Sequence, residues 1–139
     1  MKFDPRIVLA IAIGGALGSV ARYALNVGVQ SRYAQPFPLG IMVINVSGSV
    51  LLGFLMRLSL ETTAMSPSLR MFLTTGFCGG FTTFSTFSYD ALTLFEAGTF
   101  RSAWSYVIGS VSLSILGAFA GVFAGHQVGV LLRSRGVPS

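Results

Sequence analysis

The chain has 139 residues, of which 53% are hydrophobic and only 9% are charged. Together with a mean hydropathy of +0.76, this composition is far from that of soluble domains and indicates an integral membrane protein. The formal net charge is +5. Because the basic residues lie mostly at the ends of apolar segments, they favour contacts with lipid headgroups over nucleic acid.

Four apolar segments are long enough to cross a bilayer, which requires about 20 mostly apolar residues in a helix. We predict an all-α membrane protein with helices over residues 5–30, 39–60, 68–97 and 101–132. The loops between them are short, so residues 1–139 form a single predicted membrane domain. A cleaved signal peptide is the alternative for the first segment, since Lys2 and Arg6 precede Ala10-Ile11-Ala12, but the apolar run continues past Ala12.

Four spans place both chain ends on one side of the membrane. By the positive-inside rule that side is the cytoplasmic one, because it carries more basic residues. It has Lys2, Arg6, Arg57, Arg70, Arg133 and Arg135, against Arg32 and Arg101 on the other side.

The first predicted helix contains one buried charge, Arg22. Its guanidinium must reach the interface, bind backbone carbonyls or face a wet vestibule. It is either an interfacial anchor or a cation that raises the anion concentration at a pore mouth. Gly14 and Gly18 in the same helix follow the small-xxx-small pattern of closely packed membrane helices.

The second predicted helix carries Asn45 within "INVSGS". A carboxamide offers two N–H donors and one carbonyl acceptor in the middle of the span. Asn45 could therefore bind an anion through its donors or hold two helices together.

The third predicted helix contains "GGFTTFSTFSYD", residues 79–90, in which six of twelve residues are Gly, Thr or Ser. Glycines weaken a helix and threonine hydroxyls compete for backbone groups, so we predict a break from Gly79 to Thr82. Broken backbone at membrane depth must be buried or line a cavity, and its free carbonyls suit a hard cation. After the break, Phe84 and Phe87 share a helix face beside the hydroxyls of Ser85, Thr86 and Ser88.

The fourth predicted helix carries one stripe at four-residue spacing, with a single step of three residues between Ser114 and Gly117. Tyr106, Ser110 and Ser114 lead into Gly117, Gly121, Gly125 and Gly129. Helix packing alone is an alternative reading of this stripe, because serine and glycine are common wherever membrane helices touch.

Nothing in the sequence indicates an enzyme. No paired acids, phosphate-binding loop or cluster of metal ligands is present. His126, the single histidine, is predicted to be a polar residue near the membrane surface without a particular role. Cys78, the single cysteine, is predicted to pack as a small apolar residue and excludes an internal disulfide.

These segments together carry a family resemblance. "GFCGGFTTFSTFSYD" closely resembles the third-helix motif of the Fluc (CrcB) fluoride channels, and "GGALGSVARY" and "INVSGS" agree with the first and second helices. The resemblance covers essentially the whole chain. It implies a dual-topology antiparallel homodimer in the inner membrane of a bacterium, which exports fluoride passively through two pores and gives resistance to fluoride.

The resemblance also implies roles for individual residues. It places a structural Na⁺ at the dimer interface, held by the backbone carbonyls of Gly79 and Thr82 from both subunits, and it makes Arg22 the vestibule arginine. The residues that it places along the fluoride path are Asn45, Phe84, Phe87, Ser85, Thr86, Tyr106, Ser110 and Ser114.

Two features depart from the family pattern. Gly40 is followed by Ile41, where the family commonly has threonine, so one hydroxyl is missing from the expected pore entrance. The Lys/Arg bias between the two sides is larger than dual insertion implies.

Two other kinds of protein fit the same outline. A small multidrug transporter is also a four-helix dimer, but it needs an acidic residue in the first helix, where this chain has only Arg22 as a charged group within the span. A non-conducting accessory subunit, whose polar residues only join helices, predicts no ion flux from the purified protein.

Overall fold

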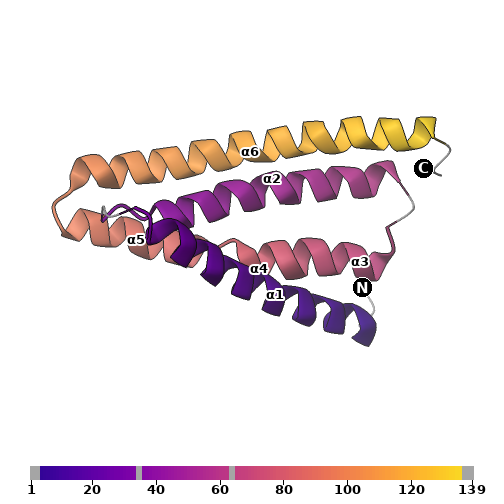
Figure 1. Ribbon diagram of the computed structural model, residues 1–139, viewed down its shortest axis with the longest axis horizontal. Helices are drawn as coiled ribbons and strands as arrows, with labels where there is room; N and C mark the ends of the chain where they lie inside the picture. Colours follow the sequence, from indigo (N-terminus) through magenta and orange to yellow (C-terminus); the bar gives the residue numbers. More distant parts are fainter. Residues whose placement is uncertain (1–3, 34–35, 63–64, 136–139) are drawn as a thin grey trace.

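The computed structural model describes residues 4–33, 36–62 and 65–135, and all regular secondary structure in this part of the chain is helical. Figure 1 shows four roughly antiparallel passes, with the first and last described residues at the same end of the molecule. The elements are α1 (Pro5–Gln30), α2 (Leu39–Glu61), α3 (Pro67–Met71), η1 (Phe72–Cys78), α4 (Gly79–Phe81), α5 (Phe84–Glu96) and α6 (Phe100–Ser134).

Local sequence signals set several of these helix ends. Asp4 caps α1 by accepting a hydrogen bond from the N–H of Arg6 at 2.9 Å, and Pro5 follows at the first helical position. Ser66 caps α3 in the same way, accepting from the N–H of Leu69 at 3.3 Å. Gly98 ends the third pass with φ of +69°, a left-handed conformation that glycine adopts without steric penalty.

Three of the described helices, α1, α2 and α6, are long and apolar enough to cross a membrane. The third pass consists of α3, η1, α4 and α5: the first three form one continuous helical stretch that changes from α to π and back, and a backbone break separates α4 from α5. Its first half includes a π-helix, Phe72–Cys78, a form that is rare and mostly found in short stretches. The chain is therefore a multi-pass membrane protein built from four helical passes.

Close glycine contacts join α1 to the first half of the third pass. A methyl group added at Gly14 would overlap the carbonyl oxygen of Phe72, and one at Gly18 would overlap that of Phe77. A methyl at Gly80 would meet the carbonyl oxygen of Gly15 in the same way. The small-xxx-small pattern of α1 is thus used for helix packing, as its sequence predicts.

The helices α2 and α6 run in the same direction and lie side by side (Figure 1). Their seam follows the glycine stripe of α6, where a methyl at Gly121 would overlap the carbonyl oxygen of Val50 and one at Gly125 would lie 2.6 Å from that of Phe54. The polar half of the stripe faces inward as well, because Tyr106 and Ser110 are both buried.

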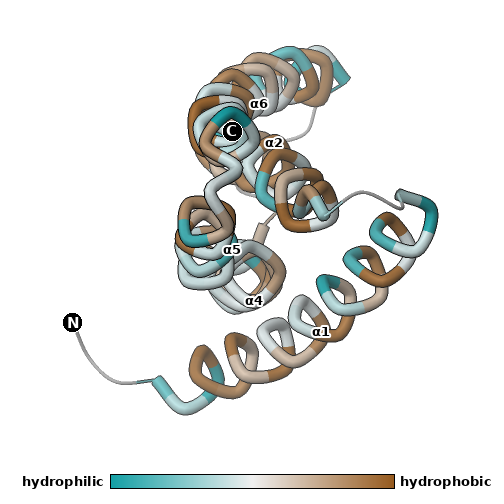
Figure 2. The backbone as a smooth tube through the Cα atoms, turned by 90° about the vertical axis from the view of Figure 1, so that its left-hand side faces the viewer, coloured by the Kyte–Doolittle hydropathy of each residue, from teal (hydrophilic) through white to brown (hydrophobic). Residues whose placement is uncertain are grey.

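Much of the apolar surface of the single chain is uncovered. The exposed large side chains include Leu17 and Val20 on α1 and Phe119 and Phe123 on α6. Figure 2 shows hydrophobic residues along the outward-facing turns of α1 and α6. Exposed apolar faces of this extent fit lipid or a second protein surface rather than water.

Candidate functional site

The third pass is interrupted at Thr82 and Thr83, whose backbones are extended, with φ and ψ of −78° and 159° at Thr82 and −153° and 119° at Thr83. The break that the sequence predicts is present, but its position differs from the prediction. Gly79 and Gly80 are helical and form the first residues of α4. The glycines do not open the backbone: Gly80 serves the contact with α1, and the two threonines form the extended link.

Asn45 of α2 holds this extended link through two hydrogen bonds. Its Nδ2 donates to the carbonyl oxygen of Thr83 at 3.0 Å, and its Oδ1 accepts from the N–H of Thr83 at 2.8 Å. In a continuous helix that N–H would donate to the carbonyl of Gly79 instead. The Oδ1 of Asn45 thus replaces the backbone acceptor that the break removes, as a buried N–H requires in a membrane, and Nδ2 adds a second donor to the Thr83 carbonyl, which is the N-cap carbonyl of α5.

Thr83 also starts the next helix. Its hydroxyl oxygen accepts from the N–H of Thr86 at 3.2 Å and so caps α5. The same hydroxyl donates to the Thr86 hydroxyl at 3.0 Å and lies 3.3 Å from that of Ser85. The first N–H groups of α5 have no helical acceptor, and this helix end carries a partial positive charge.

A pocket of about 320 Å³ lies beside the break, between α2, the third pass and α6. Its lining contains no charged side chain, and its polar groups are hydroxyls, one carboxamide and backbone. The lining residues are Asn45, Gly48, Ser49, Leu52, Thr82, Thr83, Phe84, Phe87, Ser110, Val111, Ser114 and Ile115.

Several donors in this pocket are not used by the chain itself. Ser110 is 3% exposed, and its hydroxyl is buried without a hydrogen-bond partner among the described residues. Ser49 and Ser114 likewise make no side-chain hydrogen bond within the described ranges. Asn45 commits only one of its two amide hydrogens to Thr83. A buried hydroxyl without a partner is unfavourable, so the pocket is built to receive a hydrogen-bond acceptor.

Aromatic rings form one wall of the site. Phe84 is 78% exposed at the mouth of the pocket and Phe87 is buried at 8%, with 5.6 Å between their ring centroids. Behind them, the ring of Tyr106 packs 5.3 Å from that of Phe87, and its hydroxyl donates to a carboxylate oxygen of Asp90 at 3.4 Å. The edges of aromatic rings carry partial positive charge and can face an anion.

The structure brings together only part of the predicted site. Asn45, Phe84, Phe87, Ser110, Ser114 and Thr82 line the pocket, while Ser85, Thr86, Tyr106, Gly79 and Arg22 are not among its lining residues. Thr86 and Ser85 lie next to it through their contacts with Thr83, and Tyr106 lies behind Phe87. Ile41 is buried in the apolar core with Ile44.

Two residues of the site were missed by sequence reasoning. Thr83 is both the helix cap and the partner of Asn45, and threonine is a residue type that helices prefer at the N-cap, so the sequence contains this signal. Ser49 lies one helical turn after Asn45 on α2, so its spacing alone places it on the same face.

The arrangement suits reversible binding of a small anion rather than chemistry. Neutral donors and ring edges surround the space, and no acid–base pair or nucleophile lies among the lining residues. Within the described ranges, no group of three or more His, Cys, Asp and Glu side chains could hold a metal ion.

Comparison with known proteins identifies the family. Residues 9–122 match the model of the CrcB-like protein family, Camphor Resistance (CrcB). The chain is 50% identical over 121 residues to the "Fluoride-specific ion channel FluC" of Geobacter sulfurreducens, covering 87% of this chain and 98% of that protein. It is 45% identical over 115 residues to the FluC of Rhizobium meliloti, covering 83% and 92%, and 43% identical over 123 residues to that of Bacteroides fragilis, covering 86% and 96%. Relatives of this kind are ion channels rather than enzymes, and the chain belongs to the CrcB family.

Proposed function

We propose that the protein is a fluoride channel that lets fluoride leave the cell passively and so gives resistance to its toxicity. One observation carries the proposal: a single uncharged pocket collects the unused donors of Asn45, Ser49, Ser110 and Ser114 beside two phenylalanine edges. The names of the relatives, which are fluoride-specific ion channels, support the identity of the ion.

Neutral donors suit conduction of a small, strongly hydrated anion. A selective path must replace the water shell of the ion at close range, yet release the ion again. Hydroxyls and one carboxamide N–H do this without the deep electrostatic trap that a buried arginine would create. The hydroxyls of Tyr106, Ser85 and Thr86 extend this track beyond the pocket in our proposal.

The proposal includes a homodimer. One four-pass bundle is too small to enclose an aqueous path, and Phe84, at the pocket mouth, is mostly exposed in the single chain. A second copy covering that mouth would bury the ring and close the path. With two equivalent pockets, the dimer would contain two pores.

The break also offers a site for a structural Na⁺ between the two copies. Because the N–H of Thr83 donates to Asn45, the carbonyl of Gly79 loses its usual helical donor, and the extended backbone of Thr82 turns its carbonyl out of the helix. A methyl added at Gly79 would meet nothing within 4 Å, so the glycine is not needed for packing within one chain. Backbone carbonyls are suitable ligands for a hard cation, and two copies of Gly79 and Thr82 would supply four.

Two further parts of the proposal concern charge. Arg22 of α1, placed in a wet vestibule, would raise the local fluoride concentration.

An antiparallel dimer in the inner membrane of a bacterium requires insertion in both orientations, in spite of the Lys/Arg bias. Labelling of single cysteines on intact cells tests this, with the cysteine introduced at Ser31 or at Ser66 in a Cys78→Ala background. If insertion is dual, each site is labelled from outside in part of the molecules. Labelling of only one of the two sites contradicts dual insertion.

Fluoride efflux from proteoliposomes, measured with a fluoride electrode, tests the function. Ser110→Ala should slow efflux by about two- to tenfold, the effect of one hydrogen bond, and Asn45→Asp should abolish it, because a fixed negative charge would repel the anion. Ser112→Ala is the matched control, since Ser112 lies on the same helix, is exposed and is outside the pocket. Absence of fluoride flux from the unmodified protein in the dimeric state would refute the proposal and favour an accessory subunit.

A further inference from the structure

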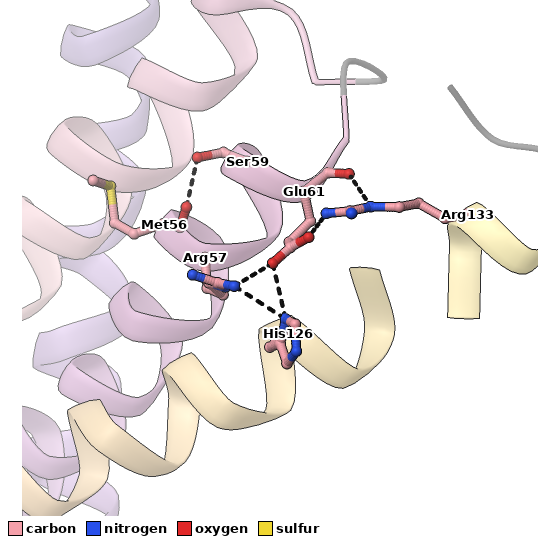
Figure 3. A network of polar contacts seen from close by, with 6 residues as sticks. All are labelled: Met56, Arg57, Ser59, Glu61, His126 and Arg133. Atoms are coloured by element: carbon pink, nitrogen blue, oxygen red, sulfur yellow. Dashed lines mark hydrogen bonds and ion pairs between the residues drawn. The ribbon is translucent and has the colours of Figure 1, made fainter. Parts of the chain in front are cut away.

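Glu61, the last residue of α2, is a buried carboxylate at 4% exposure that the pocket does not use. Its Oε1 lies 2.5 Å from Nη2 of Arg57 and 2.9 Å from Nδ1 of His126, and its Oε2 forms an ion pair with Arg133. Arg133 Nε also donates to the backbone carbonyl of Glu61 at 3.2 Å (Figure 3). We call Arg57, Glu61, His126 and Arg133 the Glu61 cluster.

The Glu61 cluster corrects the expectation that His126 has no particular role, and it joins the end of α2 to the last turns of α6. Gly129 makes room for it, because a methyl group there would overlap the Cβ of Glu61. His126, Gly129 and Arg133 all lie after residue 122, beyond the part of the chain that matches the family model. Arg57 and Glu61 lie within the matched residues 9–122, so the cluster joins matched to unmatched parts of the chain.

The glycine part of the α2–α6 seam does not fix the register of the two helices well. The glycines of α6 at 117, 121, 125 and 129 recur every four residues. A slide of α6 by four residues, about 6 Å at 1.5 Å per residue, would place each glycine where its neighbour lies now. A repeat of this kind permits close approach, but it specifies position along the axis poorly.

The Glu61 cluster occurs once along this seam, so it can select one register. A slide by one turn would separate Glu61 from both His126 and Arg133 of α6 and leave this buried carboxylate with Arg57 alone, and breaking a buried ion pair is strongly unfavourable. Single buried polar residues select the register of coiled coils in the same manner. The register matters for the pocket because Asn45 and Ser49 are on α2, whereas Ser110 and Ser114 are on α6.

We propose that Glu61 is a positioning residue: through His126 and Arg133 of α6 it sets the register of α6 on α2 and thereby the place of Ser110 opposite Asn45. The transport consequence rests on the proposed function, whereas the register itself does not.

A disulfide between the two helices measures the register directly. In a Cys78→Ala background, Val50→Cys with Gly117→Cys should crosslink, because a Cβ at Gly117 lies 3.0 Å from a methyl carbon of Val50. Adding Glu61→Gln should lower the crosslink yield about fivefold, the effect of losing a coupling of roughly 1 kcal/mol. Glu96→Gln, the same change at an exposed glutamate at the end of α5, should leave the yield unchanged.

Fluoride efflux per dimer, measured after size-exclusion chromatography, gives the functional readout. Glu61→Gln and Arg133→Gln should each slow efflux about fivefold, and the double variant should be no slower than either alone, because the two residues act as one unit. Gly129→Ala, which keeps every charge, should slow efflux as well. Its control is Gly28→Ala, where the nearest atom to the new methyl would be the tip of Arg32 at 3.7 Å.

Native crosslink yield and native efflux in Glu61→Gln would overturn the proposal. If Glu61→Gln does not fold, Arg133→Lys decides, since it keeps the charge but removes the Nε bond to the Glu61 carbonyl: a lowered crosslink yield supports the proposal and an unchanged yield overturns it. A protein that crosslinks as expected but passes no fluoride in its unmodified form would refute the fluoride channel and leave the register role of Glu61 standing.

Discussion

Replacing Asn45 by alanine should destabilise the fold, apart from any effect on transport. The substitution removes the donor and the acceptor that bond the Thr83 backbone at 3.0 and 2.8 Å. Thr83 is buried, so its N–H would lose its partner out of reach of water, whereas its carbonyl would keep the donor from within α5. Polar groups left unsatisfied in this way cost about 1–3 kcal/mol each.

The size of the effect follows from two limits. Side-chain hydrogen bonds in membranes contribute about 0.6 kcal/mol on average, so two bonds set a lower limit of about 1 kcal/mol. One unsatisfied N–H, at up to about 3 kcal/mol, and the lost second bond of the carbonyl, at about 1 kcal/mol, set an upper limit of about 4 kcal/mol. We expect a loss of about 1–3 kcal/mol, because the Thr83 N–H can partly recover by donating to Gly79 as in a continuous helix.

Reversible unfolding in mixed micelles, followed by the fluorescence of Trp104, measures this loss. Ser47→Ala is the matched control, because Ser47 lies on the same helix, is exposed, and bonds only the carbonyls of its own helix. A change below about 0.5 kcal/mol for Asn45→Ala, within the range of ordinary surface substitutions, would refute the view that Asn45 holds the break.

Three further predictions concern local geometry. Gly18→Leu should abolish folding, because the side chain would overlap the carbonyl of Phe77, whereas Gly28→Ala should not; recovery of monodisperse protein from detergent tests both. Thr83→Val should cost about 1 kcal/mol by removing the cap of α5 while Thr83→Ser should restore most of it, and equal stability of the two variants would exclude the capping role. Gly98→Ala should cost about 1–2 kcal/mol of unfolding free energy, because its φ of +69° is unfavourable for alanine; an unchanged value would mean that the turn relaxes.

The helices and the existence of the break could be predicted from the sequence, because apolar length and glycine and threonine content act locally. The position of the break could not. Gly79 and Gly80 are the weakest helix formers in the segment, but Gly80 is needed for the contact with α1, and the partner that stabilises an open backbone is Asn45 on another helix. Local propensity cannot reveal a bond to a residue 38 positions away.

Part of the site was predictable for a similar reason. Ser110 and Ser114 follow from helical spacing, which places them on one face. The Glu61 cluster could not be predicted, because it joins residues 57, 61, 126 and 133 from two helices, and the charges alone do not show which of them meet.

The pairing of Asn45 with Thr83 has a consequence for how the chain matures. The hydrogen bonds that hold the Thr83 backbone at the break come from Asn45 of α2. The interruption is therefore a property of the assembled bundle and not of the third segment by itself. That segment emerges from the ribosome after α2 and would enter the bilayer as a more regular helix, because an open backbone in lipid has no other source of partners. Its two threonines would then be pulled out of the helix only when they meet Asn45. The pocket would thus be created in a late step of folding, by the docking of two segments that were each complete helices beforehand.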